Sequence, residues 1–211
     1  IQNFCSEDLG GFYLDILKDR LYTTKQDSPP RRAAQCALYH VTQSLLRLIA
    51  PILSFTAEEA WRIVSPGDAT VFAQIWHQLP AIPHEDELTA KWLEIRNFRS
   101  SVLKKLEEAR ASGVIGSSLQ AEVEIRVSGS KREMLAGLNN DLRFVLITSR
   151  AMLAAGDGQG GEAIVVAPSS HRKCERCWHY RADVGADPLH AEICARCVAN
   201  LYGAGEPRVY A

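Results

Sequence analysis

Residues 174–180 read Cys-Glu-Arg-Cys-Trp-His-Tyr, and residues 194–197 read Cys-Ala-Arg-Cys. Two C-x-x-C pairs separated by sixteen residues are typical of a zinc site, because each pair can bend into a tight knuckle that presents two thiolates. Two knuckles complete a tetrahedron around one ion. The spacing therefore predicts a closed, structural metal site that holds together a segment with too few apolar residues to fold unaided.

Other readings of these cysteines stay open. A redox pair or an iron–thiolate centre would use the same side chains. A disulfide framework fits less well, because the chain shows no secretory segment and Cys5 and Cys36 stand alone. His171, His179 or His190 could replace one thiolate as a ligand, or could donate a hydrogen bond to a ligand without touching the metal. The interpretation that we favour is one zinc ion, whose predicted ligands are Cys174, Cys177, Cys194 and Cys197.

Basic and aromatic side chains alternate around these cysteines. The basic ones are Arg172, Lys173, Arg176, Arg181 and Arg196, and the aromatic ones are Trp178, His179 and Tyr180. Planar rings stack on unpaired bases, and guanidinium groups reach phosphates or base edges, which is how single-stranded RNA loops are read. The pattern predicts an RNA-binding surface. The alternative is that Trp178 only caps the small core over the metal.

The composition bounds the class of protein. A chain of 211 residues, 46% hydrophobic and 23% charged, can form one or two globular domains. Its net charge of −1 argues against indiscriminate coating of nucleic acid, so any RNA contact must come from local patches. No apolar run is long enough to span a bilayer, and the N-terminus has neither a leader pattern nor an initiator Met. We expect no membrane association and a chain that is either an excised piece of a longer protein or a processed product.

Helical periodicity dominates the first half. It predicts helices over residues 6–22, 29–50, 56–64 and 86–112. Thr56 and Glu59 have the spacing of a capping box for the third of these, and Gly113 is the expected terminator of the fourth. Residues 71–76 suggest a short extended piece. Antiparallel helices joined by short connections predict a bundle.

The period changes to two after residue 116. Residues 121–127 alternate apolar and polar, which predicts a half-buried strand, and residues 130–140 return to helix. The β-rich runs 144–148 and 163–167 could pair with that strand, with 156–161 as a turn or linker. The expected fold is mainly α. It has a helical bundle over 1–116, a small α+β subdomain over 117–168 and a four-cysteine zinc finger over 169–211.

Signals for catalysis are missing from the sequence. It has neither a glycine-rich phosphate loop nor a nucleophile elbow. The adjacent carboxylates at 58–59 and 107–108 fit caps and solvated faces, and His40 and His77 have no partner in sequence. The residues alone favour an RNA- or partner-binding module without a catalytic residue.

Longer stretches resemble the anticodon-binding helical domain of bacterial isoleucyl-tRNA synthetases. These are FYLDILKDRLY at 12–22, RRA at 31–33 and APILSFTAEEAW at 50–61, followed in the family's order by 92–96, 106–110, 115–121 and 174–180. The helical motifs would also suit the valyl and leucyl relatives. The C-x-R-C-W-H-Y segment selects the isoleucyl family, and the resemblance covers the whole chain, most weakly over 65–84 and 128–162.

The resemblance implies a class I aminoacyl-tRNA synthetase that activates isoleucine with ATP and charges tRNA(Ile) in the bacterial cytoplasm, with a monomeric parent protein. The H-I-G-H and K-M-S-K-S signatures do not occur here, and the editing domain is missing too. ATP binding and catalysis are therefore expected outside this sequence. The expected task of this fragment is to bind the anticodon stem-loop.

Carried over residue by residue, the resemblance places zinc on the four cysteines and anticodon contacts on Arg176 and Trp178. On the helical side, Lys18, Arg20, Arg31 and Arg32 are candidates for phosphate contacts. Their alternative is a solvated face with salt bridges, such as Asp15 with Lys18. Two rival classes remain, a stand-alone zinc-ribbon interaction protein and a small redox or electron-transfer module.

Overall fold

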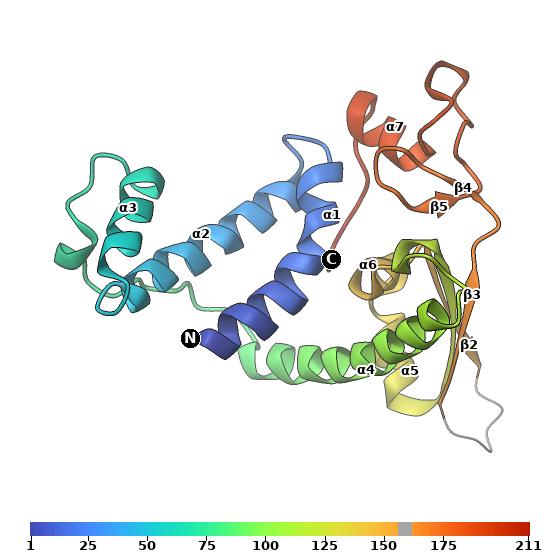
Figure 1. The fold of residues 1–211 in the computed structure, drawn as a ribbon, viewed down its shortest axis with the longest axis horizontal. Helices are drawn as coiled ribbons and strands as arrows, with labels where there is room; N and C mark the ends of the chain where they lie inside the picture. Colours follow the sequence, from blue (N-terminus) through green and yellow to red (C-terminus); the bar gives the residue numbers. More distant parts are fainter. Residues whose placement is uncertain (156–161) are drawn as a thin grey trace. The chain divides into compact units, whose positions relative to one another are not determined.

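The computed structural model of the chain describes residues 1–155 and 162–211. They form two compact units (Figure 1), one of Ile1–Arg31 with His84–Ala211 and one of Arg32–Pro83. The expected turn at 156–161 lies outside the described residues. The expected division at residues 116 and 168 stays a prediction.

The fold is mainly α, as the periodicity predicts. The helices are a π-helical stretch η1 (Phe4–Leu14), α1 (Asp15–Thr23), α2 (Pro29–Ile49), α3 (Ser54–Val64), α4 (Glu85–Ala111), α5 (Gly129–Ala136), α6 (Leu142–Leu146) and α7 (Ala195–Tyr202). Short 3-10 turns are η2 (Val71–Ala73), η3 (Ser118–Gln120), η4 (Asn139–Asp141) and η5 (Pro188–His190). The strands are β1 (Ala121–Val127), β2 (Arg150–Ala155), β3 (Ala163–Pro168), β4 (Arg172–Lys173) and β5 (Tyr180–Arg181). Within the described residues, no helix has the length and apolar character needed to cross a membrane.

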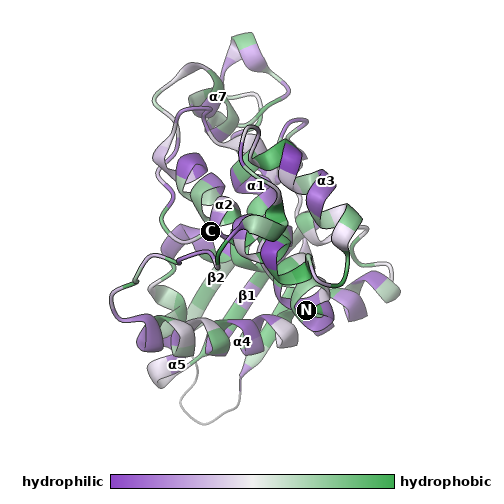
Figure 2. Ribbon diagram, turned by 90° about the vertical axis from the view of Figure 1, so that its left-hand side faces the viewer, coloured by the Kyte–Doolittle hydropathy of each residue, from purple (hydrophilic) through white to green (hydrophobic). Residues whose placement is uncertain are grey.

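A three-stranded sheet organises the first unit. β1 is its central strand, parallel to β2 and antiparallel to β3. The alternation predicted for β1 is confirmed: Ala121, Val123, Ile125 and Val127 are buried, whereas the intervening side chains are half-buried or exposed. The apolar colouring of β1 and β2 in Figure 2 matches this pattern. One face of the sheet therefore carries the core.

Helix α4 covers that core. Ile95, Phe98, Val102 and Leu106 recur at helical spacing and are all buried with the β1 residues. Figure 1 shows α4 beside the sheet. The helix ends where Gly113 takes the left-handed conformation with a φ of 74°, as expected for a glycine terminator. Leu88, one turn before Trp92 in the first part of α4, is by contrast 42% exposed.

Two predictions in the first unit are wrong or shifted. Residues 144–148 do not form a strand, because 142–146 form the short helix α6, which buries Phe144, Val145 and Leu146 in the core. A run of apolar residues satisfies burial in either conformation, so it could not distinguish strand from helix. The first helix begins earlier than residue 6, through the π-helical stretch that contains Gly10 and Gly11.

The second unit packs α3 against α2. Its small core contains Leu46, Ala50, Ala57, Trp61 and Val71. The Trp61 indole Nε1 donates to the Ala69 carbonyl at 2.8 Å, which attaches the following loop to α3. Helix α2 ends at Ile49, just before Pro51, as its ring requires.

The expected capping box is wrong. Helix α3 begins at Ser54 with Leu53 as its N-cap and no side-chain cap, so Thr56 lies inside the helix. The Glu58 carboxylate instead accepts hydrogen bonds from the Thr70 hydroxyl at 2.7 Å and the Val71 amide at 3.0 Å. Residues 71–73 form a 3-10 turn rather than an extended piece, because the Thr70 side chain accepts from the Phe72 amide. His40 and His77, without partners in sequence, meet at 2.8 Å between Nδ1 and Nε2.

Two valines on neighbouring strands test where the core lies. We expect Val123→Ala on β1, where the side chain is 0% exposed, to lower the free energy of unfolding by about 2 kcal/mol through lost burial and a residual cavity. Val165→Ala on β3, where the side chain is 48% exposed, should change it by less than about 0.5 kcal/mol. Denaturant unfolding of both variants measures the difference, and equal losses would contradict this core.

Candidate metal centre and adjoining pockets

The first cysteine pair lies at the turn of a small hairpin. β4 and β5 pair through Arg172 with Arg181 and Lys173 with Tyr180. The Trp178 amide donates to the Cys174 carbonyl at 2.9 Å, and the Cys174 amide donates to the His179 carbonyl at 2.8 Å. These bonds close the knuckle and bring Cys174 and Cys177 together.

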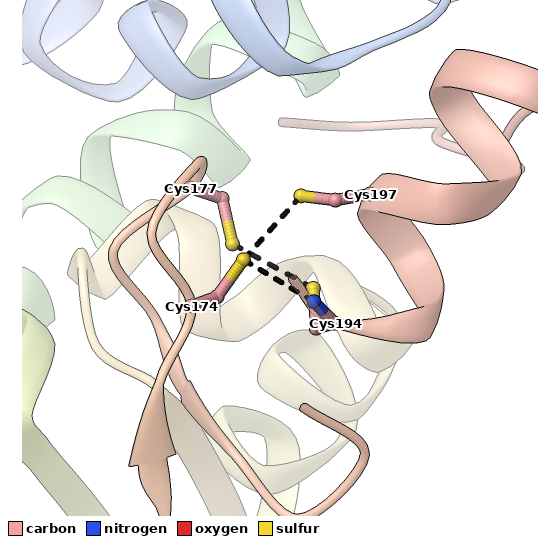
Figure 3. Close-up of side chains that lie close together, drawn as sticks. All are labelled: Cys174, Cys177, Cys194 and Cys197. Atoms are coloured by element: carbon pink, nitrogen blue, oxygen red, sulfur yellow. Dashed lines mark hydrogen bonds between the residues drawn. The ribbon is translucent and has the colours of Figure 1, made fainter. Parts of the chain in front are cut away.

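The second pair lies at the start of α7. Cys194 is the N-cap residue of this helix, and Cys197 falls within its first turn. The side chains of both point toward the hairpin pair in Figure 3. The structure therefore brings all four predicted ligands to one place.

The four sulfurs have the geometry of a tetrahedral thiolate site. They all lie within 4.8 Å of one another, and the Sγ atoms of Cys174 and Cys197, and of Cys177 and Cys194, are 3.8 Å apart. A tetrahedron with zinc–sulfur bonds of about 2.3 Å has edges of about 3.8 Å. All four cysteines are buried. The cluster therefore fits a closed zinc site, and it contains no histidine.

Four thiolates at these distances need a cation. Hydrogen bonds from Cys177 and Cys197 lower the pKa of Cys194, whereas contacts with Cys177 and Cys194, together with burial, raise the pKa of Cys197. A divalent ion would stabilise all four sulfurs as thiolates.

The zinc segment is joined to α1 by a buried carboxylate that sequence reasoning missed. Asp19 accepts two hydrogen bonds from Arg196, both at 2.8 Å, and one from Arg208. His179, only 3% exposed, places its Nε2 3.5 Å from the same carboxylate. Burial raises the pKa of Asp19, but hydrogen bonds from Arg196 and His179 and the charges of the two arginines outweigh it, so this pKa lies well below its ordinary value. Asp19 is ionised and joins α1 to the segment after Cys174.

Arg176 also joins the zinc segment to α1. Its guanidinium donates to the Thr23 carbonyl at 2.7 Å and to the Tyr22 carbonyl at 3.3 Å. These carbonyls belong to the C-terminal end of α1, where a cation is favourable. Arg176 therefore holds the knuckle against α1, a role that its place in the C-x-x-C motif does not indicate.

Trp178 is exposed beside the buried cysteines. Its side chain is 60% exposed, and its backbone has a φ of 64°, a left-handed conformation that disfavours bulky residues. Lys173 Nζ lies 5.4 Å from the ring centroid. Trp178 thus does not fill the metal core, and the knuckle turn fixes its direction.

A hollow of about 410 Å³ adjoins this ring, and we refer to it as the Trp178 pocket. Its walls come from α1, the α6 end and the knuckle. They include Lys18, Tyr22, Leu119, Ile147, Arg176 and Trp178. Cavities of this size commonly hold small ligands or single groups of larger ones.

The other predicted contacts are dispersed. Lys18 is exposed and pairs with Asp15 at 3.1 Å, as its alternative reading expected. Arg20 is only 8% exposed, and its Nε and Nη2 have no hydrogen-bond partner among the described residues. A guanidinium buried in this way does not face a phosphate in solvent. Arg31 is half-buried and Arg32 exposed near the start of α2.

Comparison with known proteins agrees with this geometry. Residues 1–125 match the family described as the anticodon-binding domain of tRNA ligase, and residues 172–200 match the zinc finger found in FPG and IleRS. Since the first match covers more than half of the chain, the chain belongs to the anticodon-binding family of tRNA ligases. The zinc-finger match and the four-cysteine cluster together support one structural zinc ion.

Over its whole length, the chain is similar to part of bacterial isoleucine–tRNA ligases. It is 58% identical over 208 residues to that of Paraburkholderia xenovorans strain LB400, covering 99% of this chain and 22% of the relative. The ligase of Bordetella petrii is 55% identical over 217 residues, covering 99% and 23%. That of Aromatoleum aromaticum is 54% identical over 212 residues, covering 100% and 23%. The chain thus spans about a fifth of the length of these relatives.

The buried carboxylate of α1 gives a direct test of the junction. We expect Asp19→Asn to lower the free energy of unfolding by about 3–5 kcal/mol, because it leaves two buried arginines, Arg196 and Arg208, with Glu206 as their one remaining paired anion. Asp8→Asn is the matched control. Asp8 pairs with Arg96 at the surface, so its loss should cost less than about 1 kcal/mol. Urea unfolding followed by tryptophan fluorescence compares the two, and a small effect at Asp19 would refute the junction.

Proposed function

We propose that this chain is the tRNA-binding part of an isoleucine–tRNA ligase and recognises the anticodon stem-loop. The observation that carries the proposal is Trp178, held exposed in a left-handed backbone conformation on a knuckle organised by buried cysteines. Backbone strain of this kind is retained where the surroundings impose it, and it is concentrated at functional sites. The names of the relatives supply the substrate class.

In this proposal the Trp178 ring stacks on an unpaired base of the loop. Stacking needs an exposed π face and tolerates any base, so neighbouring polar groups must supply the selectivity. Arg176 and Lys18 border the same pocket and supply positive charge for phosphate or base edges. Arg31 and Arg32 are further candidates for phosphate contacts, and Arg20, being buried, is left out.

The proposed role of zinc is structural. We assign it to Cys174, Cys177, Cys194 and Cys197, because their sulfurs converge at the distances that a zinc tetrahedron requires. The zinc segment has few buried apolar residues besides the cysteines, Val184 being one. The metal therefore substitutes for a hydrophobic core and positions Trp178.

For the parent protein, we propose the activity that its relatives' names state, the ligation of isoleucine to its tRNA. From the family resemblance we further propose that the parent uses ATP, works in the cytoplasm and is a monomer. We assign no catalytic role to a residue of this chain. Activation and transfer would take place in parts of the parent outside this sequence, with the present chain orienting the tRNA.

Metal analysis tests the structural zinc. We expect the purified chain to carry about one zinc ion and Cys197→Ser to carry almost none, since three thiolates lose affinity and leave a ligand position open. Cys36→Ser, at an exposed cysteine outside the cluster, is the control and should retain the ion. Elemental analysis and near-ultraviolet circular dichroism report metal and fold. A coloured iron–thiolate centre, or a segment that folds unchanged without metal, would reject the assignment.

Titration with tRNA tests the binding surface. We expect the chain to prefer a tRNA with an isoleucine anticodon over one with another anticodon. Trp178→Ala should weaken binding by roughly 1–3 kcal/mol while zinc content stays constant, because one stacked base is lost. Trp76→Ala removes an equally exposed indole, 65% against 60%, and should leave affinity within about twofold. No anticodon preference, or unaltered affinity in Trp178→Ala, would favour an interaction module that does not read the anticodon.

A further inference from the structure

A second, polar pocket lies in the first unit apart from the Trp178 pocket. It has a volume of about 540 Å³. Its walls come from β1, the residues around α6, the start of β2 and the segment around β5. Its lining includes the charged side chains of Glu122, Arg143, Arg150, Arg181 and Asp183, together with Asn140 and His171.

Both carboxylates of this pocket are already engaged. Glu122 accepts from the Ser169 hydroxyl at 2.6 Å and lies 3.7 Å from Arg150 and 3.9 Å from His171. Asp183 binds Arg181 through two hydrogen bonds of 2.8 Å. Arg150 and Arg181 therefore each have a carboxylate partner within the pocket. Neither Glu122 nor Asp183 forms an ion pair with Arg143.

Arg143 makes no ion pair among the described residues, and the two carboxylates that line the pocket, those of Glu122 and Asp183, are engaged with other side chains. Its Nε is buried and has no hydrogen-bond partner in the described parts of the chain. Its guanidinium carbon lies 4.6 Å from the centroid of the Phe144 ring, which offers a face but no hydrogen-bond acceptor. Burial, together with the charges of Arg181 and Arg196, lowers the pKa of Arg143 to about 10, against the weaker opposing charges of Glu206 and Asp19. Arg143 therefore stays protonated at neutral pH, and a half-buried cation whose Nε has no hydrogen-bond acceptor is unfavourable.

We propose that this pocket, which we name the Arg143 pocket, is an oxyanion site that binds one phosphate group through Arg143. A guanidinium presents its donors in a planar fork that matches phosphate oxygens, and a phosphate would supply the acceptor that Arg143 Nε lacks among the described residues. Asn140 and His171 can donate further hydrogen bonds. The phosphate can belong to the backbone of the bound RNA, which rests on the proposed function, or to a free phosphate compound.

Thermal unfolding of the zinc-loaded chain with inorganic phosphate tests the site itself. Sodium phosphate should raise the unfolding midpoint by about 2–5 °C over sodium chloride of equal ionic strength, because a ligand that binds only the folded state stabilises it. Arg143→Gln should lose most of this shift. Arg126→Gln is the matched control: Arg126 is exposed, pairs with Glu124 and does not line the pocket, so this variant should keep the shift.

The variant also separates a folding defect from a binding defect. In phosphate-free buffer Arg143→Gln should unfold at the same or a higher temperature than the natural chain, because it removes a half-buried charge that makes no ion pair among the described residues. If Arg143→Gln does not fold, Arg143→Lys keeps the charge without the fork and should retain less than half of the phosphate shift. No shift in the natural chain, or an equal shift in all variants, would overturn the site.

Binding of tRNA identifies the source of the phosphate. A backbone phosphate in the pocket predicts that Arg143→Gln weakens tRNA binding about 3–10-fold and lowers the slope of log affinity against log salt by about one. Unchanged tRNA binding together with a lost phosphate shift would assign the site to a free phosphate compound. The natural chain reports on the proposed function independently: failure to bind tRNA would reject that function, while the phosphate shift would still support the oxyanion site.

Discussion

The ionised carboxylate of Asp19 is the interaction on which the arrangement of the first unit depends. It lies on α1, and two arginines from the far end of the sequence, Arg196 and Arg208, donate to it. Both arginines are buried, at 7% exposure. Buried charges of this kind are tolerated only when they are balanced, and Glu206 alone cannot balance both arginines, so α1 and the C-terminal segment must meet in this geometry or leave excess positive charge buried. A hydrophobic contact would constrain the relative position of α1 and the C-terminal segment less strictly, because it is not directional.

The cysteine cluster and the polar contacts with α1 have separate roles in positioning the zinc segment. Four buried cysteines bring the hairpin β4–β5 and α7 together, which fixes the segment internally. Arg176 and His179, on either side of Trp178, then contact α1 through carbonyl and carboxylate oxygens. Trp178 is thus bounded by two residues that hold the knuckle in place. An exposed aromatic ring on such a rigid support needs little ordering when a partner binds.

Charge balance distinguishes the two pockets of the first unit. In the polar pocket, Arg181 and Arg150 have internal anions, and Arg143 does not. The Trp178 pocket is lined by an aromatic ring, aliphatic side chains and a few polar groups. The first suits a compact anion and the second suits a flat, mostly apolar group. A nucleic acid offers both, a phosphate and a base, which is the chemical link between the proposed function and the further site.

The sequence by itself determined the features that depend on local spacing. The four-cysteine cluster, strand β1 and helix α4 with its end at Gly113 all follow from periods of two or 3.6 residues and from motif spacing, because neighbours along one element share a face. The resemblance to isoleucyl-tRNA synthetases likewise rests on the order of residues in the chain.

Only the tertiary structure decided the rest. It made α6 a helix where the apolar run 144–148 suggested a strand, and it replaced the capping box by a contact of Glu58 with the following loop. It also revealed Asp19 as a buried junction and Arg143 as an unpaired cation. The physical reason is the same in each case. Whether a charge is paired, and which conformation buries a short apolar run, depends on residues that are distant in the sequence or on a loop folding back, and spacing along the chain does not specify such contacts.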